Sequence, residues 1–149
     1  MYKLAVINGP NTNLLSKRQP DIYGKQTLME INQLMEAKAE TLGLKLDFFQ
    51  SNHEGMLIDR IHAAINTEDG IIINPGAYAH YSYALADALV MAGLPVVEVC
   101  LAEVNINEEF RRYSVIKQYC LRQIVGRGSQ SYLEALEYFT DYFVALSVS

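Results

Sequence analysis

The chain has 149 residues, of which half are hydrophobic, and a formal net charge of −5. This length lets a single domain over residues 1–149 bury a substantial core, and the acidic balance argues against a general nucleic-acid surface, which needs clustered Lys and Arg. Cys100 and Cys120 lack CxxC spacing, which argues against a zinc site or a disulfide framework. Because no signal peptide opens the sequence and no apolar run reaches about 18 residues, we expect a cytoplasmic protein without a membrane partner.

Five apolar runs of strand length recur along the chain, with helical segments between them. The runs span residues 2–7, 44–49, 70–74, 94–100 and 123–126. Strands that alternate with helices predict a parallel sheet, because right-handed crossover helices must lie on its faces. We therefore expect an α/β, flavodoxin-like fold: a five-stranded parallel sheet of order 2-1-3-4-5 with helices on both faces.

The first two helices are predicted from their ends and their apolar faces. Thr27 and Glu30 have the spacing of a capping box, and Gly43 is suited to end the helix that begins there. The apolar face of this helix comprises Leu28, Ile31, Met35 and Leu42. A second helical stripe comprises Leu57, Ile61, Ala64 and Ile65.

The remaining helices are predicted from similar signals. A third helix is expected over residues 82–92, closed by Gly93. The irregular connection after the fourth strand is expected to hold one helical turn at 107–112. Ser131 and Glu134 repeat the capping-box spacing, which predicts the head of a last helix running to about Leu146.

The fold class predicts where a ligand would bind. In open parallel sheets, ligands lie beyond the carboxyl ends of the strands, near the point where the strand order reverses. The loops there are residues 8–13, 50–55, 74–82 and the segment from Cys100 onward, and they carry most of the Asn and two of the three His. Such a rim suits a small polyhydroxylated ligand, although Asn and Gly are also ordinary turn formers.

Four stretches carry a specific resemblance to a known family. They are INGPNTNLLSKRQPDIYG (7–24), QSNHEGMLIDRIH (50–62), INPGAYAHYSYALADAL (73–89) and EV…EEFRR (98–112). They resemble the type II 3-dehydroquinate dehydratases, and the similarity runs through nearly the whole chain. The resemblance implies a homo-oligomer of trimers packed into a dodecamer. It also implies anti elimination of water from a small cyclic carbonyl substrate, a 3-keto acid, without metal or cofactor.

The chemistry of such an elimination explains the residue types of the first loop. A base must remove the proton alpha to the ketone, the enolate must be held, and the beta hydroxyl must leave with a proton from an acid. Tyr23 resembles the tyrosine base of the family. Because a tyrosine has an ordinary pKa near 10, it needs a cationic neighbour to ionise at neutral pH, and Arg18 is the candidate. Asn11 matches the asparagine that holds a water against the developing enolate.

Other positions match the family's substrate-binding residues. Asn74, His80 and Arg111 match its binders of ring hydroxyls, and Asp87 matches an acid that reaches the site of a neighbouring subunit. Taken by itself, His80 is also consistent with a helix-start residue that hydrogen-bonds the backbone.

The segment after the fourth strand departs from the family pattern at the general acid. The family reads EVH where this chain reads EVC, so Cys100 replaces the histidine, and Glu98 has no evident group to orient. A thiol with an ordinary pKa near 8.5 holds a proton at neutral pH, but its side chain is shorter than an imidazole and proton transfer needs an approach of about 2.6–3.2 Å. A small buried cysteine with no catalytic role is the alternative interpretation.

Three further departures affect anion binding. Leu101 matches the Ile or Leu of the family, but Ala102 replaces a hydroxyl residue that helps to hold the substrate carboxylate. Glu103 adds a negative charge close by, which repels an anionic substrate. Asn107 stands where the family usually has a second arginine, so the field that ionises Tyr23 is expected to be weaker.

Three functional hypotheses stay open. The first is a fully active 3-dehydroquinate dehydratase, and the second is a diverged enzyme that enolises a different carbonyl substrate with the same base. The third is a non-catalytic binding or assembly protein on the same scaffold. Retention of Tyr23 and Arg18 argues against the third, and the losses at 100, 102 and 107 argue against the first. The sequence thus favours a dehydratase-like enzyme of impaired or diverged activity, with Tyr23 as its base.

Overall fold

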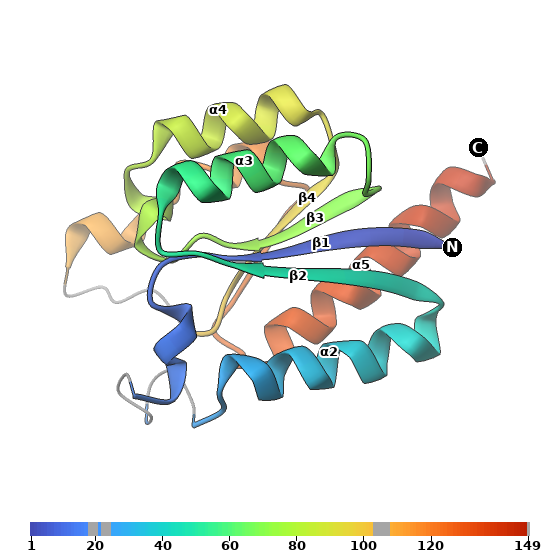
Figure 1. Cartoon of the computed structure of the whole chain (residues 1–149), viewed down its shortest axis with the longest axis horizontal. Coiled ribbons are helices and arrows are strands. Elements are labelled where there is room, and N and C mark those ends of the chain that lie inside the picture. Colours follow the sequence, from blue (N-terminus) through green and yellow to red (C-terminus); the bar gives the residue numbers. More distant parts are fainter. Residues whose placement is uncertain (18–20, 22–24, 103–107, 149) are drawn as a thin grey trace.

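The centre of the molecule is a parallel sheet. The computed structural model describes residues 1–17, 21, 25–102 and 108–148. Within these residues, five strands pair in the order β2-β1-β3-β4-β5, which confirms the expected flavodoxin-like α/β arrangement (Figure 1). The strands are β1 (Tyr2–Asn8), β2 (Leu44–Gln50), β3 (Gly70–Asn74), β4 (Val96–Cys100) and β5 (Arg122–Val125).

Helices cover both faces of the sheet. Helices α3 (Glu54–Ala64) and α4 (Tyr83–Ala92) lie on one face, and α2 (Leu28–Leu42) and α5 (Gln130–Ser147) lie on the other (Figure 1). Short 3₁₀ helices occur in the connections: η1 (Thr12–Lys17), η2 (Gly76–His80), η3 (Glu109–Arg112) and η4 (Lys117–Tyr119). The turn expected at 107–112 is thus present as η3 within the described residues. No helix in the described part of the chain is long and apolar enough to cross a membrane.

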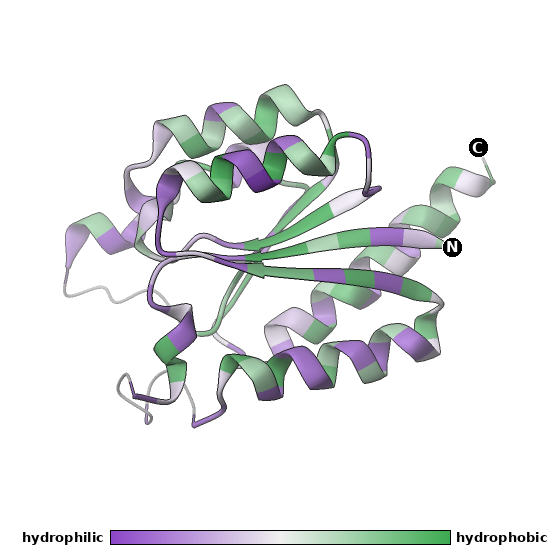
Figure 2. Ribbon diagram, in the orientation of Figure 1, coloured by the Kyte–Doolittle hydropathy of each residue, from purple (hydrophilic) through white to green (hydrophobic). Residues whose placement is uncertain are grey.

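The alternation of side chains along the strands divides the core into two clusters. In β4, Val97 and Val99 belong to the cluster under α2 and α5, and Val96 belongs to the cluster under α3 and α4. The green colouring of β3 and of most of β1 in Figure 2 reflects this burial on both faces. Because successive strand residues point to opposite faces, Glu98 and Cys100 lie on the α3/α4 side.

Several predicted helix ends are confirmed. Thr27 and Glu30 form the reciprocal capping box at the start of α2, and Gly43 ends this helix with a φ of 71°. Gly93 ends α4 with a φ of 68°, and the Ser82 side chain accepts a hydrogen bond from the backbone N–H of Leu85. These caps explain why the ends of both helices follow from local sequence.

Other boundaries differ from the prediction. The second capping box is wrong, because α5 begins at Gln130 and Ser131 is buried within it, where its Oγ accepts a hydrogen bond from the Arg127 N–H. The prediction that Ile65 belongs to the apolar stripe of the second helix is also wrong, because Ile65 follows the last residue of α3 and is exposed. β4 begins at Val96 and not at residue 94, since Pro95 has no N–H to donate to the sheet.

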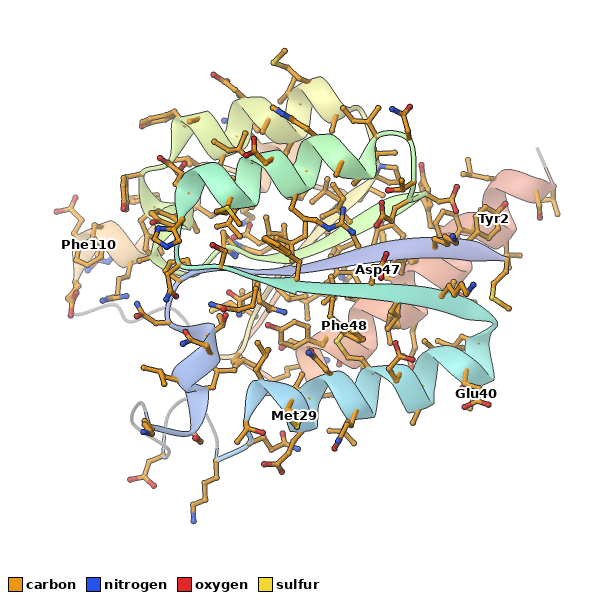
Figure 3. The ribbon with its side chains drawn as sticks, in the orientation of Figure 1. Tyr2, Met29, Glu40, Asp47, Phe48 and Phe110 are labelled. Atoms are coloured by element: carbon orange, nitrogen blue, oxygen red, sulfur yellow. The ribbon has the colours of Figure 1, made fainter. Side chains whose placement is uncertain are left out.

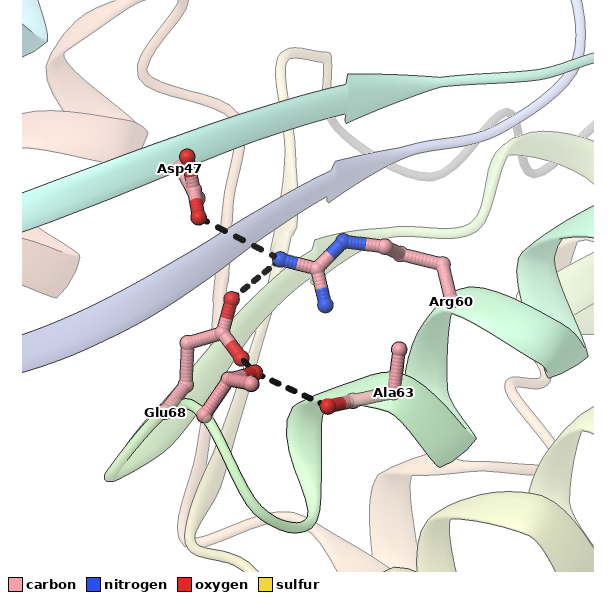
Figure 4. Close-up of polar contacts among 5 residues, drawn as sticks. Asp47, Arg60, Ala63 and Glu68 are labelled. Carbon is pink, nitrogen blue, oxygen red and sulfur yellow. Dashed lines mark hydrogen bonds and ion pairs between the residues drawn. The ribbon is translucent and has the colours of Figure 1, made fainter.

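A charged cluster ties α3 to the sheet at the end away from the site described below. The Arg60 guanidinium forms an ion pair with the buried carboxylate of Glu68, and its Nη2 lies 4.0 Å from Asp47 Oδ2 in β2 (Figure 4). The Thr67 hydroxyl contacts the second oxygen of Glu68. The buried Arg60–Glu68 pair restrains the turn between α3 and β3.

Candidate active site

A pocket of about 150 Å³ opens at the carboxyl ends of β1, β3 and β4. This is the edge of the sheet where ligand binding was predicted. The loop after β1, the η2 segment after β3, the end of β4, the segment from Arg111 to Lys117 and strand β5 all contribute to its wall. The polar and charged lining residues include Asn11, Thr12, Asn74, His80, Glu98, Arg111, Arg112, Ser114, Lys117 and Gln123.

The loops after β1 and β3 approach each other closely under the pocket. The Gly9 N–H donates to the Asn74 carbonyl at 2.8 Å, and a Cβ added at Gly9 would lie 2.6 Å from the Pro75 carbonyl oxygen. Only glycine fits this contact. Asn11 follows in the left-handed region with a φ of 69°, and its N–H donates to Asn52 Oδ1 at 2.9 Å. Asparagine tolerates this conformation better than most residues, which explains the residue type at position 11.

A fully buried phenol fixes Asn74 from below. The Tyr132 hydroxyl of α5 accepts a hydrogen bond from Asn74 Nδ2 at 2.9 Å and donates to Asn8 Oδ1. The other end of the Asn74 amide, Oδ1, accepts from the Gly76 N–H at 3.2 Å. Burial raises the pKa of Tyr132, so its hydroxyl stays protonated and available as a donor.

Glu98 is a buried acid in the pocket wall. Its side chain accepts hydrogen bonds from Ser114 Oγ at 2.8 and 2.9 Å and from Gln123 Nε2 at 3.2 Å. Burial raises the pKa of Glu98, while these two hydrogen bonds and the positive charge of Lys117 oppose the rise. Ser114 and Gln123 therefore hold its carboxyl group in place.

The 111–115 segment carries the other polar groups of the wall. His80 Nδ1 lies 2.7 Å from the Tyr113 carbonyl oxygen, so Nδ1 carries a proton and donates it in this bond. The Val115 N–H donates to the Ala79 carbonyl at 2.7 Å. Arg111 pairs with Glu108 at 2.9 Å and stacks over the ring of Phe110, at the opposite end of the molecule from Tyr2 (Figure 3).

Most of the predicted site residues that the structure describes lie in this pocket. Its wall includes Asn11, Asn74, His80, Glu98, Cys100, Leu101, Ala102 and Arg111. Asp87 does not reach it, because its side chain is exposed on α4, outside the lining. Arg18, Tyr23, Glu103 and Asn107 lie outside the described residues.

Several described residues of the site were not predicted individually from the sequence. They include Arg112, Ser114, Lys117, Gln123 and Tyr132. Only Gln123 had a usable signal, since it lies in a predicted strand and pairs in register with Glu98. The others lie outside the predicted strands. No group of three or more His, Cys, Asp or Glu side chains in the described residues is arranged to hold a metal ion.

Comparison with known proteins gives a consistent result. The family described as dehydroquinase class II matches residues 2–140. A 3-dehydroquinate dehydratase from Caldicellulosiruptor saccharolyticus is 51% identical over 137 residues, which cover 91% of this chain and 94% of that protein. The Bacillus pumilus 3-dehydroquinate dehydratase is 47% identical over 147 residues, covering 99% of this chain and 100% of the relative. The crystal structure of a type II dehydroquinase from Butyrivibrio crossotus, 42% identical, superposes with a TM-score of 0.89 and covers 92% of this chain and 96% of that one.

Proposed function

This chain belongs to the class II dehydroquinase family, and we propose on that premise that it dehydrates 3-dehydroquinate slowly, without a metal or cofactor. The observation that carries the proposal is the pocket itself. Its lining includes Asn11, Asn74, His80 and Arg111, and Cys100 lies at the end of β4, where the family resemblance implies an acid histidine. Binding groups for a hydroxylated ring are retained, whereas the proton donor is changed.

The retained residues suit the first half of the reaction. In the proposal, Tyr23 removes the proton alpha to the ketone with Arg18 beside it, as the resemblance implies for these two positions. Asn11 holds a water against the enolate oxygen, and its fixed left-handed backbone supports this role. His80 Nε2 and the Arg111 guanidinium bind ring hydroxyls, because Nδ1 of His80 is already committed to the Tyr113 carbonyl.

The altered residues weaken the second half. Loss of a general acid costs on the order of 100- to 10,000-fold in rate. The methyl group of Ala102 lines the pocket and offers no hydrogen bond to a carboxylate. Arg111 and Arg112 remain in the wall as cations for an anionic substrate. We therefore expect binding to be retained better than turnover.

The direct test measures product formation. The purified chain and the Caldicellulosiruptor relative are compared with saturating 3-dehydroquinate, and the conjugated enone is followed by its absorbance. We expect turnover on the order of 100-fold below that of the relative, at the small end of the range for a missing acid. Equal turnover would support a fully active dehydratase. Absence of both turnover and binding would contradict the proposal and favour an assembly protein.

A restoring variant tests whether the named departures cause the deficit. Cys100→His, Ala102→Ser, Glu103→Asn and Asn107→Arg are combined, because residues that act as a unit are not additive. Turnover should rise by about 10²-fold or more, since the typical contribution of a positioned acid is regained. Adding Tyr23→Phe should abolish the gain. Activity that survives this change would show that Tyr23 is not the base, and a folded but inactive quadruple variant would favour a different carbonyl substrate.

We also propose that the chain works as a homo-oligomer, and the family resemblance suggests trimers that form a dodecamer. Asp87 supports this, because its exposed position on α4 lies outside its own pocket and leaves it free to reach the pocket of a neighbouring copy.

A further inference from the structure

Lys117 is a cation in the pocket wall that the family pattern did not identify. It opens the η4 turn and lines the pocket together with Glu98 and Cys100. Its residue is exposed, while the carboxylate that it faces is only 3% exposed. The pair is not in direct contact, since no ion pair within 4.0 Å joins these two described side chains. Both side chains line the same pocket.

The backbone around Lys117 is held firmly against the same face of the sheet. Before it, the Val115 N–H donates to the Ala79 carbonyl, and Ile116 is fully buried in the cluster under α3 and α4. After it, the Leu121 N–H donates to the Val96 carbonyl at 2.8 Å. The Ser114 hydroxyl, three residues away, bonds Glu98 directly. These contacts fix the point from which the lysine side chain enters the pocket.

Strand alternation brings the three groups to one side. Glu98 and Cys100 are two residues apart in β4, so both point toward the face that the Lys117 turn covers. The charge of Lys117 acts on Glu98, since it lowers the pKa of that carboxyl group against the effect of burial. A proton donor beside Glu98 is the arrangement that the missing histidine would have supplied.

We propose that Lys117 is the proton donor to the leaving hydroxyl, which takes over the task that Cys100 is poorly placed to perform. This inference rests on the proposed dehydratase function. The base first takes the alpha proton and leaves the electron pair in the enolate. The enolate then reforms the ketone and the new carbon–carbon double bond as the beta C–O bond breaks, and the departing oxygen takes one proton from the Lys117 ammonium. Water and a neutral amine result.

A lysine can donate the proton in this step, but it is a weaker acid than a protonated histidine. A lysine ammonium carries N–H donors and can give one proton to the departing hydroxyl. It gives up that proton less readily than an imidazolium, because a good catalytic acid has a pKa near the working pH. The exposed position of the residue lets solvent return the proton after each turnover. A slow but real elimination is the expected result.

The experiment separates the two halves of the reaction. The intact protein is incubated with 3-dehydroquinate in D₂O, and deuterium uptake at the alpha carbon is followed by NMR while the enone is followed by absorbance. Uptake reports the base, and enone formation also requires the acid. In Lys117→Met, elimination should fall by about 100-fold while exchange stays within about twofold of the parent. Lys45→Met is the matched control, because this exposed lysine lies on β2 and lines no part of the pocket.

Two further variants distinguish a proton donor from a charge. Lys117→Arg keeps the positive charge but cannot donate a proton in water near neutral pH, so elimination should stay low. In a Cys100→His background, the imidazole supplies the acid, and Lys117→Met should then cost less than about threefold. Full activity in Lys117→Arg would assign the residue to substrate binding and overturn the proposal.

The remaining outcomes are decisive as well. Unchanged elimination in Lys117→Met overturns the inference and leaves the proposed function intact. If Cys100→Ser abolishes elimination in its place, Cys100 is the acid. Parallel loss of exchange and elimination in Lys117→Met, with unchanged circular dichroism, would mean that the residue binds substrate. A parent protein that shows neither exchange nor elimination would refute the proposed function itself.

Discussion

Tyr132→Phe is expected to destabilise the protein through two amide groups of the site. Tyr132 is fully buried in α5, and its hydroxyl bridges Asn8 Oδ1 and Asn74 Nδ2. Phenylalanine keeps the ring and its packing but removes the bridge. A buried polar group that loses its partner costs about 1–3 kcal/mol.

The magnitude follows from the exposure of the two amides. Asn8 is only 1% exposed, so its oxygen should bear most of that cost. Asn74 lines the pocket, where water can replace part of the lost bond. We therefore expect a total loss of about 2–4 kcal/mol in the free energy of unfolding. With a typical urea m-value of about 2 kcal/mol per molar, the midpoint should fall by roughly 1–2 M.

Urea unfolding followed by circular dichroism measures this shift. Tyr2→Phe is the control, because Tyr2 loses the same atom from an exposed ring that stacks on Phe143. Under the proposed function, Tyr132→Phe should also raise KM for 3-dehydroquinate, since Asn74 is no longer held in one orientation. A midpoint shift no larger than that of the Tyr2→Phe control would refute the bridging role.

Three further predictions follow from other parts of the molecule. Gly9→Ala should destabilise the protein by about 1–3 kcal/mol and lower its melting temperature, because the added Cβ overlaps the Pro75 carbonyl. Gly55→Ala is the control: no atom lies within 4 Å of its added Cβ, so its melting temperature should stay the same or rise. Iodoacetamide at pH 8 should label Cys100 before Cys120, because burial raises the pKa of Cys120 to about 12. Only about one Cys120 side chain in 10⁴ is then a thiolate at pH 8. The rate of Cys120 labelling should therefore rise about tenfold per pH unit. Peptide mapping that finds Cys120 labelled first would contradict this. Sedimentation at micromolar concentration should give a mass well above the 16.8 kDa of the chain. Asp87→Ala should lower turnover per site in mixed oligomers. A monomeric sedimentation profile would rule out a site shared between subunits.

The sequence determined the strands and most helix ends because their signals are local. Alternating and continuous apolar runs specify burial, and Thr27 with Glu30 satisfies the first backbone donors of α2 without help from the rest of the chain. The second capping box failed for a tertiary reason. Ser131 has the right spacing, but its hydroxyl is buried beneath the Arg127 N–H, so packing of α5 decided where that helix begins.

The sequence also determined which edge of the sheet carries the polar groups, since all parallel strands end on the same side. What it did not determine are several of the residues that meet there. Ser114, Gln123 and Tyr132 lie 16, 25 and 58 residues from their partners Glu98 and Asn74, and such pairs arise only when the strands and α5 are packed. Lys117 belongs to the same class, because its turn is brought to Glu98 by backbone contacts to η2 and β4. The chemical character of each side chain follows from the sequence. Only the folded structure brings an acid, a cation and a pocket together into one site.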